Sequence, residues 1–415
     1  MAKHLERAPR SSDAVLSIVL AGGQGCRLHD LTREDAKPAL PIGPGAHLID
    51  FTLANVVNSG IRSSLVLTQH APQSLQDHVE RCWVSDDAGC SFAVLDGADH
   101  GPFTGTADAV VKIIAQVDLR SPRHVVVLAG DHLYQMDYRP FLDRHLACDA
   151  DVTVGVVHVP LAQASGFGVL AADLDFRITE FAEKPERPPE ALDRPGHALA
   201  SMGIYVFAWP ALRRMLLDMA GTVSELDFGR HVIPAFVAKG TAVAYALPAR
   251  DDREPMWQDL GTLDAYHGVQ RRLVEGALVL DPSWPIVYQG VAGTAERSAV
   301  GLGATLRNVV VMPGALIGRE AMLSDAIVMG DAVVPDGFDL DDTIARHGLW
   351  CTISAAGIRV ISARALAKLA SRERRSIQQA RAAAQVTPAD RRMSIGTRTP
   401  MQRPADLAVP IASVA

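Results

Sequence analysis

The chain has 415 residues, of which 48% are hydrophobic and 21% charged, the balance of a globular protein long enough for two or more domains. A formal net charge of -7 argues against nucleic acid as the main partner, because phosphate backbones recruit basic surfaces. The five cysteines have no zinc-ligand spacing, and a scattered odd set favours a reducing cytosol over a disulfide framework. The first apolar stretch (15–21) is too short to cross a bilayer, so we expect a cytoplasmic protein without membrane association.

Strands and helices alternate in the predicted elements of the first part of the chain. Residues 1–13 are polar and are expected to be flexible, and residues 14–23 (AVLSIVLAGG) predict a buried strand that enters a glycine loop. Similar β-branched runs follow at 63–69, 124–131 and 151–157, and stretches of helical character lie at 74–83 and 106–117. This order predicts an α/β fold, a mostly parallel sheet with helices on both faces in a Rossmann-like catalytic domain over 14–275.

The pattern changes after residue 275. A linker is expected over 276–298, and small aliphatic residues then recur about every six positions between Ala299 and Asp339. This period predicts a short left-handed parallel β-helix, with its C-terminal segment, over 299–370; an ordinary β-rich region is the alternative. From residue 371 the chain is rich in Arg, Ala and Pro, which predicts a frayed helix followed by a disordered tail.

The strongest local signal is LAGGQGCRLHDLTREDAKPAL, at residues 20–40. Glycines at 22, 23 and 25 let backbone N–H groups approach a phosphate chain, and Arg27 and Lys37 add positive charge beside them. The segment is neither the GxGxxG dinucleotide fingerprint nor the GxxxxGK[ST] phosphate loop. Its specific feature is Gly-Gly-x-Gly-x-Arg-Leu followed by Leu-Thr and Ala-Lys-Pro-Ala.

Further ordered motifs follow this segment. They are LIDFTLANVVNSGI (48–61), GTADAV (105–110), LAGDHLY (128–134), FGVL (167–170), FAEKP (181–185), ASMGIYVF (200–207), LDFGRHVIP (226–234) and MWQDLGTLDAY (256–266). Together they resemble the nucleotidylyltransferase superfamily and, within it, the bacterial glucose-1-phosphate adenylyltransferases, over residues 15 to 290 and less faithfully to 370. The resemblance implies conversion of ATP and α-D-glucose 1-phosphate to ADP-glucose and pyrophosphate, for glycogen or α-glucan synthesis.

The resemblance also implies roles for individual residues. In the family, an Arg and Lys pair stabilises the phosphates and two aspartates hold Mg²⁺, which implies Arg27, Lys37 and Asp131 as catalytic residues and Asp131 and Asp259 as metal ligands. The implied nucleotide-binding residues are Gly22, Gly23, Gly25, Gln69, Gly105, Thr106 and Asp108. The implied sugar phosphate-binding residues are Gly168, Glu183, Lys184, Ser201, Tyr205, Asp227, Phe228 and Trp257.

The chain departs from the family pattern at several places. Phe103-Thr104 stands where Tyr-Arg is common and the preceding loop is short, which leaves the strength of the ATP preference open. Cys26 stands where Thr is common, which indicates a tolerated small residue, with a redox switch beside the phosphates as the alternative. Many members are activated by glycolytic phosphates through basic residues, and the positions here are Glu34, Asp35 and His47. The β-helix is shortened as well, so a homo-oligomer is expected but the usual homotetramer is not assured.

Three functions fit the sequence. The first is an active, allosteric ADP-glucose-forming enzyme, and the second is a nucleotidylyltransferase for another nucleotide or sugar 1-phosphate. The third is a non-catalytic regulatory subunit of the same fold. Such subunits usually lose a metal-binding aspartate or a member of the basic pair. This chain keeps Arg27, Lys37, Asp131 and Asp259, which favours catalysis.

Overall fold

A computed structural model describes residues 14–43, 45–85, 89–249, 254–288 and 298–385 of the chain. The chain divides into two compact units, Met1–Leu366 and Ala367–Ala415. The predicted flexible N-terminus and residues 386–415 of the predicted tail lie outside the described residues. Among those described, no helix is long and apolar enough to cross a membrane.

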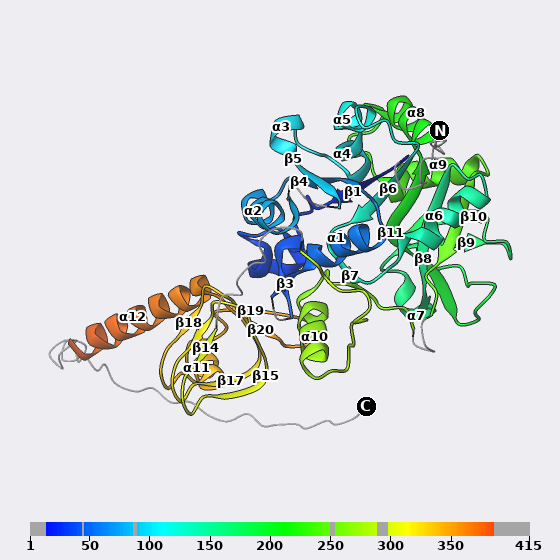
Figure 1. The fold of residues 1–415 in the computed structure, drawn as a ribbon. Helices are drawn as coiled ribbons and strands as arrows, with labels where there is room; N and C mark the ends of the chain where they lie inside the picture. Colours follow the sequence, from blue (N-terminus) through cyan, green and yellow to red (C-terminus); the bar gives the residue numbers. More distant parts are fainter. Residues whose placement is uncertain (1–13, 44, 86–88, 250–253, 289–297, 386–415) are drawn as a thin grey trace, which may run out of the picture. The chain divides into compact units, whose positions relative to one another are not determined.

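A nine-stranded sheet forms the centre of the first unit in the described part of the chain (Figure 1). Its main path is β10 (Ile178–Glu183), β9 (Gly168–Ala172), β11 (His197–Ala208), β6 (His124–Ala129), β1 (Val15–Leu20), β4 (Ser63–Thr68) and β5 (Ser91–Asp96). Strands β6, β1, β4 and β5 are mutually parallel neighbours, whereas β11 is antiparallel to β6 and β9. β8 (Val152–Pro160) is antiparallel to β11 and parallel to β12 (Ala242–Ala246).

Alternation along the central strands creates two apolar faces, because successive side chains point to opposite sides of a sheet. In β1 and β6, Ile18 and Val127 belong to one buried cluster, and Val19 and Leu128 to the other. The helices that contribute to the first cluster are α4 (Thr106–Lys112), α5 (Ile114–Asp118), α8 (Trp209–Met219), η4 (Phe228–Val232) and α9 (Ile233–Ala238). Those that contribute to the second are α1 (Leu48–Asn58), α2 (Pro72–Trp83) and α6 (Tyr138–Ala147). The predicted α/β class, with helices on both faces, is confirmed.

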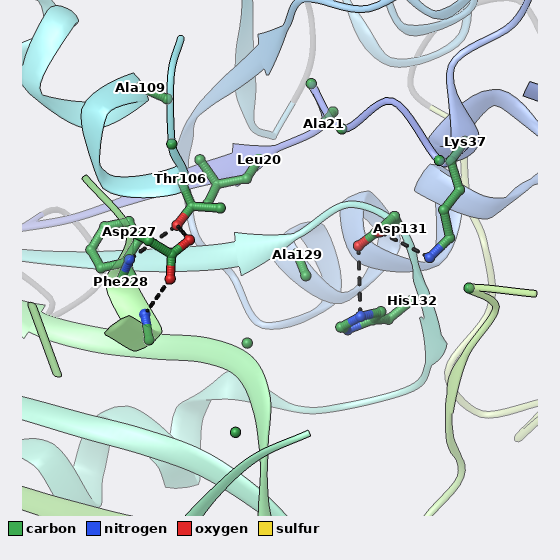
Figure 2. Close-up of a pocket in the computed structure, with 18 of the residues that line it drawn as sticks. Leu20, Ala21, Lys37, Thr106, Ala109, Ala129, Asp131, His132, Asp227 and Phe228 are labelled. Carbon is green, nitrogen blue, oxygen red and sulfur yellow. Dashed lines mark hydrogen bonds and ion pairs between the residues drawn. The ribbon is translucent and has the colours of Figure 1, made fainter. Parts of the chain in front are cut away.

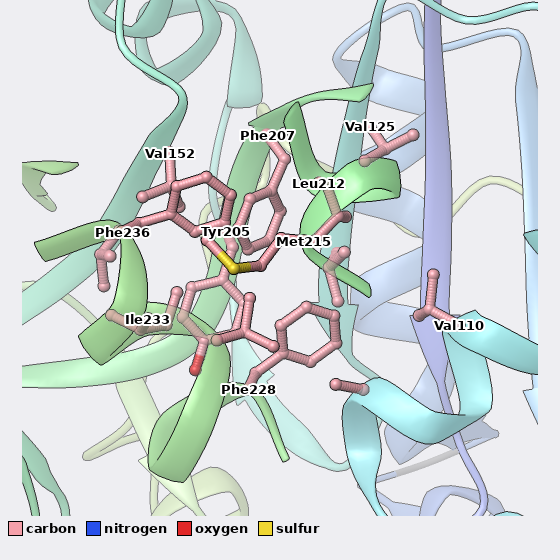
Figure 3. Close-up of a cluster of buried hydrophobic side chains, with 14 of the residues drawn as sticks. Val110, Val125, Val152, Tyr205, Phe207, Leu212, Met215, Phe228, Ile233 and Phe236 are labelled. Atoms are coloured by element: carbon pink, nitrogen blue, oxygen red, sulfur yellow. The ribbon is translucent and has the colours of Figure 1, made fainter. Parts of the chain in front are cut away.

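Aromatic side chains fill part of the first cluster. Figure 3 shows Tyr205 and Phe207 of β11 packed beside Phe228 and Phe236. The Tyr205 and Phe228 ring centroids are 5.6 Å apart, and those of Phe207 and Phe236 are 5.7 Å apart. Ring pairs at these separations stabilise the fold by more than the burial of their surface alone. The cluster therefore fixes β11 and η4, two elements that carry predicted site residues.

A short antiparallel pair lies beyond the carboxyl end of β6. β7 (His132–Tyr134) pairs with β13 (Trp257–Asp259), and Asp259 lies opposite His132 in the register. This pairing brings Asp131, two residues after the end of β6, close to a segment more than a hundred positions later in the sequence. α10 (Leu263–Val274) follows β13 directly.

Parallel coils occupy the last part of the first unit. β15 (Thr305–Val311), β17 (Met322–Val328) and β20 (Arg359–Ile361) are parallel, as are β14 (Ala299–Val300), β16 (Leu316–Ile317) and β18 (Val333–Val334) (Figure 1). Asn308 donates to Asp325 one coil later, a separation of 17 residues. This arrangement is consistent with the predicted β-helix. α11 (Leu340–His347) and β19 (Thr352–Ile353) complete the segment, and α12 (Ala363–Gln385) follows.

The remaining short elements connect these parts. They are η2 (Cys26–Thr32), η3 (Lys37–Ala39), β2 (Pro41–Ile42), β3 (Ala46–His47), α3 (Gly97–His100) and α7 (Leu161–Ala164). The helix predicted over 106–117 is two helices, because Ile113 leaves the helical region with φ −111° and ψ 12°. The predicted domain boundaries stay predictions.

Candidate active site

A cavity of about 700 Å³ opens beyond the carboxyl ends of β1 and β6. This edge is where open α/β sheets bind their ligands. Nearly all of the predicted site residues line the cavity; Asp108 and Asp259 do not. Figure 2 shows two groups of polar side chains within it: Lys37, Asp131 and His132 at one end, and Thr106 and Asp227 at the other.

The glycine loop after β1 forms one wall. Gly25 has φ +60°, and a Cβ there would lie 3.0 Å from Thr32 Cγ2 and 3.2 Å from Lys37 Cβ. Only glycine takes this conformation and this close approach without strain. The Thr32 hydroxyl donates to the Gly25 carbonyl at 2.9 Å, so the loop is fixed against the last residue of η2. Arg27 therefore extends from a rigid turn.

Lys37 joins two carboxylates that lie far apart in the sequence. Its Nζ donates to Asp131 Oδ2 at 2.9 Å and to Asp259 Oδ1 at 3.1 Å. The residue is 5% exposed, and a lysine this buried is stable only when paired. Burial alone would lower the pKa of Lys37, but the charges and hydrogen bonds of the two aspartates outweigh it and raise that pKa above 10.5.

The carboxylate of Asp131 is held ionised by its neighbours. Burial favours the neutral acid, but the charges of His132 and Lys37 and the Lys37 hydrogen bond outweigh burial and lower the pKa of Asp131. Asp259 contacts the same ammonium group, so two negative charges converge on one point. Two ionised carboxylates beside a cation form a donor set that suits a hard divalent metal.

His132 was not identified as a site residue from the sequence. Its Nε2 lies 3.7 Å from Asp131 Oδ1 and 3.9 Å from Asp259 Oδ1. Its Nδ1 is 3.1 Å from the Met202 carbonyl, and since a carbonyl only accepts, Nδ1 carries a proton. The sequence does contain a signal for His132, because it directly follows Asp131 in the LAGDHLY motif; only the role of the aspartate was predicted from that motif.

A second polar group joins predicted nucleotide and sugar residues. The Thr106 hydroxyl donates to Asp227 Oδ2 at 2.7 Å and accepts from the Phe228 backbone N–H at 3.0 Å. The other Asp227 oxygen accepts from the backbone N–H groups of Gly229 and Arg230 at 2.9 and 3.1 Å. Asp227 therefore caps η4, and its orientation is fixed before any ligand binds.

Close packing beside this second polar group requires glycine at position 105. A Cβ at this position would lie 2.2 Å from the Leu226 carbonyl oxygen, which accepts from the Ala107 and Asp108 N–H groups at the start of α4. Asp108 itself does not line the cavity, and its carboxylate accepts from the Thr104 N–H at 2.8 Å. It also pairs with Lys112 at 2.8 Å.

Glu183 and Lys184 stand at the open side of the cavity. A Cβ on Gly168 or Gly229 would lie 2.8 Å from Glu183 Oε2, so both glycines make room for that carboxylate. Lys184 has φ +51° and an exposed side chain, with its Nζ 3.7 Å from Glu183 Oε1. An exposed ammonium beside a cavity is free to reorient toward a bound anion.

The aromatic and hydroxyl residues close the inner wall. The Trp257 ring lies 5.3 Å from the His132 and Phe167 ring centroids, and its buried Nε1–H has no hydrogen-bond acceptor among the described residues. Burial raises the pKa of Tyr205 above its ordinary value, so its hydroxyl stays protonated. Ser201 Oγ accepts from the Gly203 N–H at 3.3 Å.

Gln69 uses its amide within the protein. Its Oε1 accepts from the Phe103 N–H, and its Nε2 donates to the Phe103 carbonyl at 3.1 Å. Both ends of the side chain therefore fix the segment before Gly105. Gln69 thus positions this wall and also lines the cavity, and its role in nucleotide binding stays a prediction.

Comparisons with known proteins agree on one family. A family model described as nucleotidyl transferase matches residues 16–276. The glucose-1-phosphate adenylyltransferase of Thiobacillus denitrificans is 37% identical over 397 residues, which cover 85% of this chain and 90% of that protein. The enzyme of the same name from Jannaschia sp. is 36% identical, over 85% of this chain and 96% of that protein. Glucose-1-phosphate adenylyltransferase 2 of Alkalilimnicola ehrlichii is 42% identical, over 65% of this chain and 66% of that protein.

Proposed function

The chain belongs to the nucleotidyl transferase family, and from this premise we propose that it is a glucose-1-phosphate adenylyltransferase, converting ATP and α-D-glucose 1-phosphate to ADP-glucose and pyrophosphate. The observation that carries the proposal is one cavity lined by the glycine loop, by Lys37 and Asp131, and by the sugar-side residues, with Asp259 bonded to Lys37. Two polyanionic substrates have to meet in this reaction. A cavity that combines cations, paired carboxylates and hydroxyl-binding groups meets that requirement.

The family generally uses a divalent metal, and we infer that the metal here is Mg²⁺. The proposal is supported by the ammonium of Lys37, which lies between the carboxylates of Asp131 and Asp259, so this pair already stabilises one positive charge; hard oxygen ligands suit Mg²⁺. These two residues would hold the ion. When bound, it would neutralise charge on the phosphates and so favour attack on the α-phosphorus.

The protein's own side chains have separate tasks in this proposal. The glycine-loop N–H groups and Arg27 hold the triphosphate, and Lys37 adds a buried positive charge beside it. Lys184 binds the phosphate of the sugar, while the Glu183 and Asp227 carboxylates accept hydrogen bonds from its hydroxyls. One oxygen of the sugar phosphate attacks the α-phosphorus in line, and pyrophosphate leaves with the electron pair of the broken P–O bond.

The direct test is a substrate panel. Purified protein with Mg²⁺ is incubated with each nucleoside triphosphate and each common hexose 1-phosphate, and pyrophosphate release is followed. The expected result is the highest kcat/KM for ATP with glucose 1-phosphate. Faster turnover with another pair would assign the chain to a different substrate within the family. The nucleotide is the substrate more open to such a change, because Phe103-Thr104 replaces the common Tyr-Arg. No release with any pair would favour the non-catalytic subunit.

Further properties follow from the proposed activity. ADP-glucose would supply glycogen or α-glucan synthesis, which places the protein in the cytoplasm. A homo-oligomer, with no nucleic-acid or membrane partner, stays a prediction.

A further inference from the structure

A fully buried carboxylate lies under the first turn of α1, away from the cavity described above. Asp50 Oδ2 accepts from the His47 N–H at 2.7 Å and from the Tyr288 hydroxyl at 2.9 Å. Asp50 Oδ1 accepts from His78 Nε2 at 2.6 Å and from Trp83 Nε1 at 2.8 Å. Two helices and the segment after α10 thus converge on one carboxylate.

Two imidazoles lie against this carboxylate. The His47 and His78 ring centroids are 3.9 Å apart, and His47 Nδ1 is 3.8 Å from Asp50 Oδ2. The buried Nδ1 of His47 has no hydrogen-bond partner among the described residues. One ligand atom from each of the three residues lies within 4.8 Å of the other two. An unpartnered imidazole nitrogen next to a second imidazole and a carboxylate is the arrangement a metal ion would satisfy.

We propose that His47, Asp50 and His78 form a second metal site, specific for a divalent transition metal of the zinc type and separate from the proposed catalytic centre. Two imidazoles and one carboxylate are the three protein ligands found in many zinc sites, with a fourth position left open. Imidazole ligands favour Zn²⁺, Co²⁺ or Ni²⁺ over Mg²⁺, which prefers oxygen.

The geometry needs one local adjustment. Ligand atoms about 2.0–2.1 Å from a tetrahedral ion lie about 3.3 Å from one another. The 3.8 Å between His47 Nδ1 and Asp50 Oδ2 is within half an ångström of this separation. The 2.6 Å hydrogen bond between His78 and Asp50 must open as the ion replaces its proton. The ring of His47 is partly exposed, so rotation of this side chain absorbs most of the change.

The surroundings hold the carboxylate in place. Asp50 is fully buried, and its two oxygens accept hydrogen bonds from four donors, so its orientation is fixed before an ion binds. Trp83 and Tyr288 still orient the carboxylate, as outer partners do around metal ligands. His47 and His78 line a second cavity of about 550 Å³, whose charged lining residues are Asp30, Glu34, Asp35 and Asp331 together with Arg33, Arg81 and Arg364. Water in this cavity can supply the open coordination position.

The test uses the full-length protein stripped of metal with a chelator and then titrated with Co²⁺ in excess Mg²⁺, which saturates oxygen-only sites. The expected result is one equivalent of Co²⁺ with visible d–d bands of a low-coordinate, imidazole-bound ion. His47→Gln should abolish the bands and weaken binding at least about tenfold, the scale of losing a ligand or its support. His158→Gln is the matched control, because His158 pairs with Asp193 at 3.0 Å as a two-residue group.

Two further variants separate this site from the catalytic centre. Asp131→Asn/Asp259→Asn should keep the Co²⁺ bands, and their loss would assign the metal to those carboxylates and overturn the proposal. His78→Gln should also lose the bands, with circular dichroism verifying its fold because the residue is buried. Wild-type protein that gives only the spectrum of hydrated Co²⁺, or His47→Gln protein that retains the bands, contradicts the site.

Discussion

At the scale of single residues, the position of Lys37 decides the chemistry of the main cavity. Its ammonium is separated by 94 residues from Asp131 and by 222 from Asp259, yet it donates to both. A buried charge is tolerated only when its partners repay the loss of hydration, and removing one partner is costly. Any ligand that draws Lys37 away must therefore replace it with another cation between the two aspartates.

Asp131→Asn is expected to reduce turnover by at least about a hundredfold, the scale of losing a main electrostatic stabiliser. The amide has nearly the same shape as the carboxylate but carries no charge for the metal. Steady-state kinetics at saturating Mg²⁺ measures the effect, and Asp218→Asn, an exposed aspartate of α8, is the control. Turnover near the wild-type value would remove Asp131 from the metal site.

Lys184→Ala is expected to raise the KM for glucose 1-phosphate far more than the KM for ATP. The exposed ammonium of Lys184 stands at the side of the cavity that carries Glu183 and Gly168, so its loss removes a charge-assisted contact to one phosphate only. Both constants are measured with the second substrate saturating, and Lys239→Ala, on the exposed end of α9, should change neither. Equal effects on both substrates would contradict the assignment.

At the scale of elements, the sequence predicted the strands whose apolar side chains pack on both faces of the sheet. The run at 124–131 became β6, because Val125 and Val127 face one helical layer and Val126 and Leu128 the other. The antiparallel insertion of β11 next to β6 was not predicted, since residue patterns mark burial and not strand partners.

The candidate site was predicted mainly through its motifs. Spacing along the chain could place Arg27 and Lys37 near one loop, but it could not show that β7 and β13 pair to bring Asp259 beside Asp131. The contact of Gln69 with the Phe103 backbone was out of reach for the same reason. These are tertiary contacts between distant segments, and no local pattern encodes them.

His145 of α6 is expected to make stability fall in mild acid. The residue is 1% exposed. Its Nδ1 lies 2.9 Å from the Thr153 hydroxyl of β8, and its Nε2 lies 3.2 Å from His124 Nδ1. Burial and, secondly, the charge of His124 lower the pKa of His145 from 6.5 to about 4. The unfolded chain therefore takes up a proton at higher pH than the folded chain. The resulting stabilisation is fully present above pH 6.5 and is lost as the pH falls toward 4, by about 3 kcal/mol at most.

Urea unfolding of wild-type and His145→Gln protein at several pH values between 7 and 4 measures this contribution. The variant should be less stable than wild type at pH 7 and should lose less stability on acidification, so the two curves converge. His158→Gln, a variant of a partly exposed His–Asp pair, should follow the wild-type curve more closely. Parallel losses in wild type and His145→Gln would show that other groups dominate the acid response.

At the scale of the whole molecule, polar residues of the first unit line two separate cavities. The larger one carries the glycine loop, Lys37 and the sugar-side residues. The second is lined from η2, η3, α2 and the segments around Met312 and Met329. The 3₁₀ helix η3 begins at Lys37 and continues to Ala39 in the lining of the second cavity, so a short rigid element connects the two.

Activation by fructose 1,6-bisphosphate is expected to be weak or absent. The three positions at which related enzymes use cations for such activators are Glu34, Asp35 and His47 here, and the structure brings all three together in the second cavity. Allosteric coupling is a difference in binding free energy of typically about 1–3 kcal/mol, and a bisphosphate draws most of it from charged contacts. Two carboxylates beside the ligand would repel it and so weaken the coupling, although Arg33, Arg81 and Arg364 line the same cavity. The measurement is initial rate against bisphosphate concentration at subsaturating ATP, with Glu34→Lys/Asp35→Arg protein as the complementary variant, which should gain a response. Roughly tenfold or greater activation of the wild-type protein, well above the low end of typical coupling, would show that other residues of this chain bind the activator.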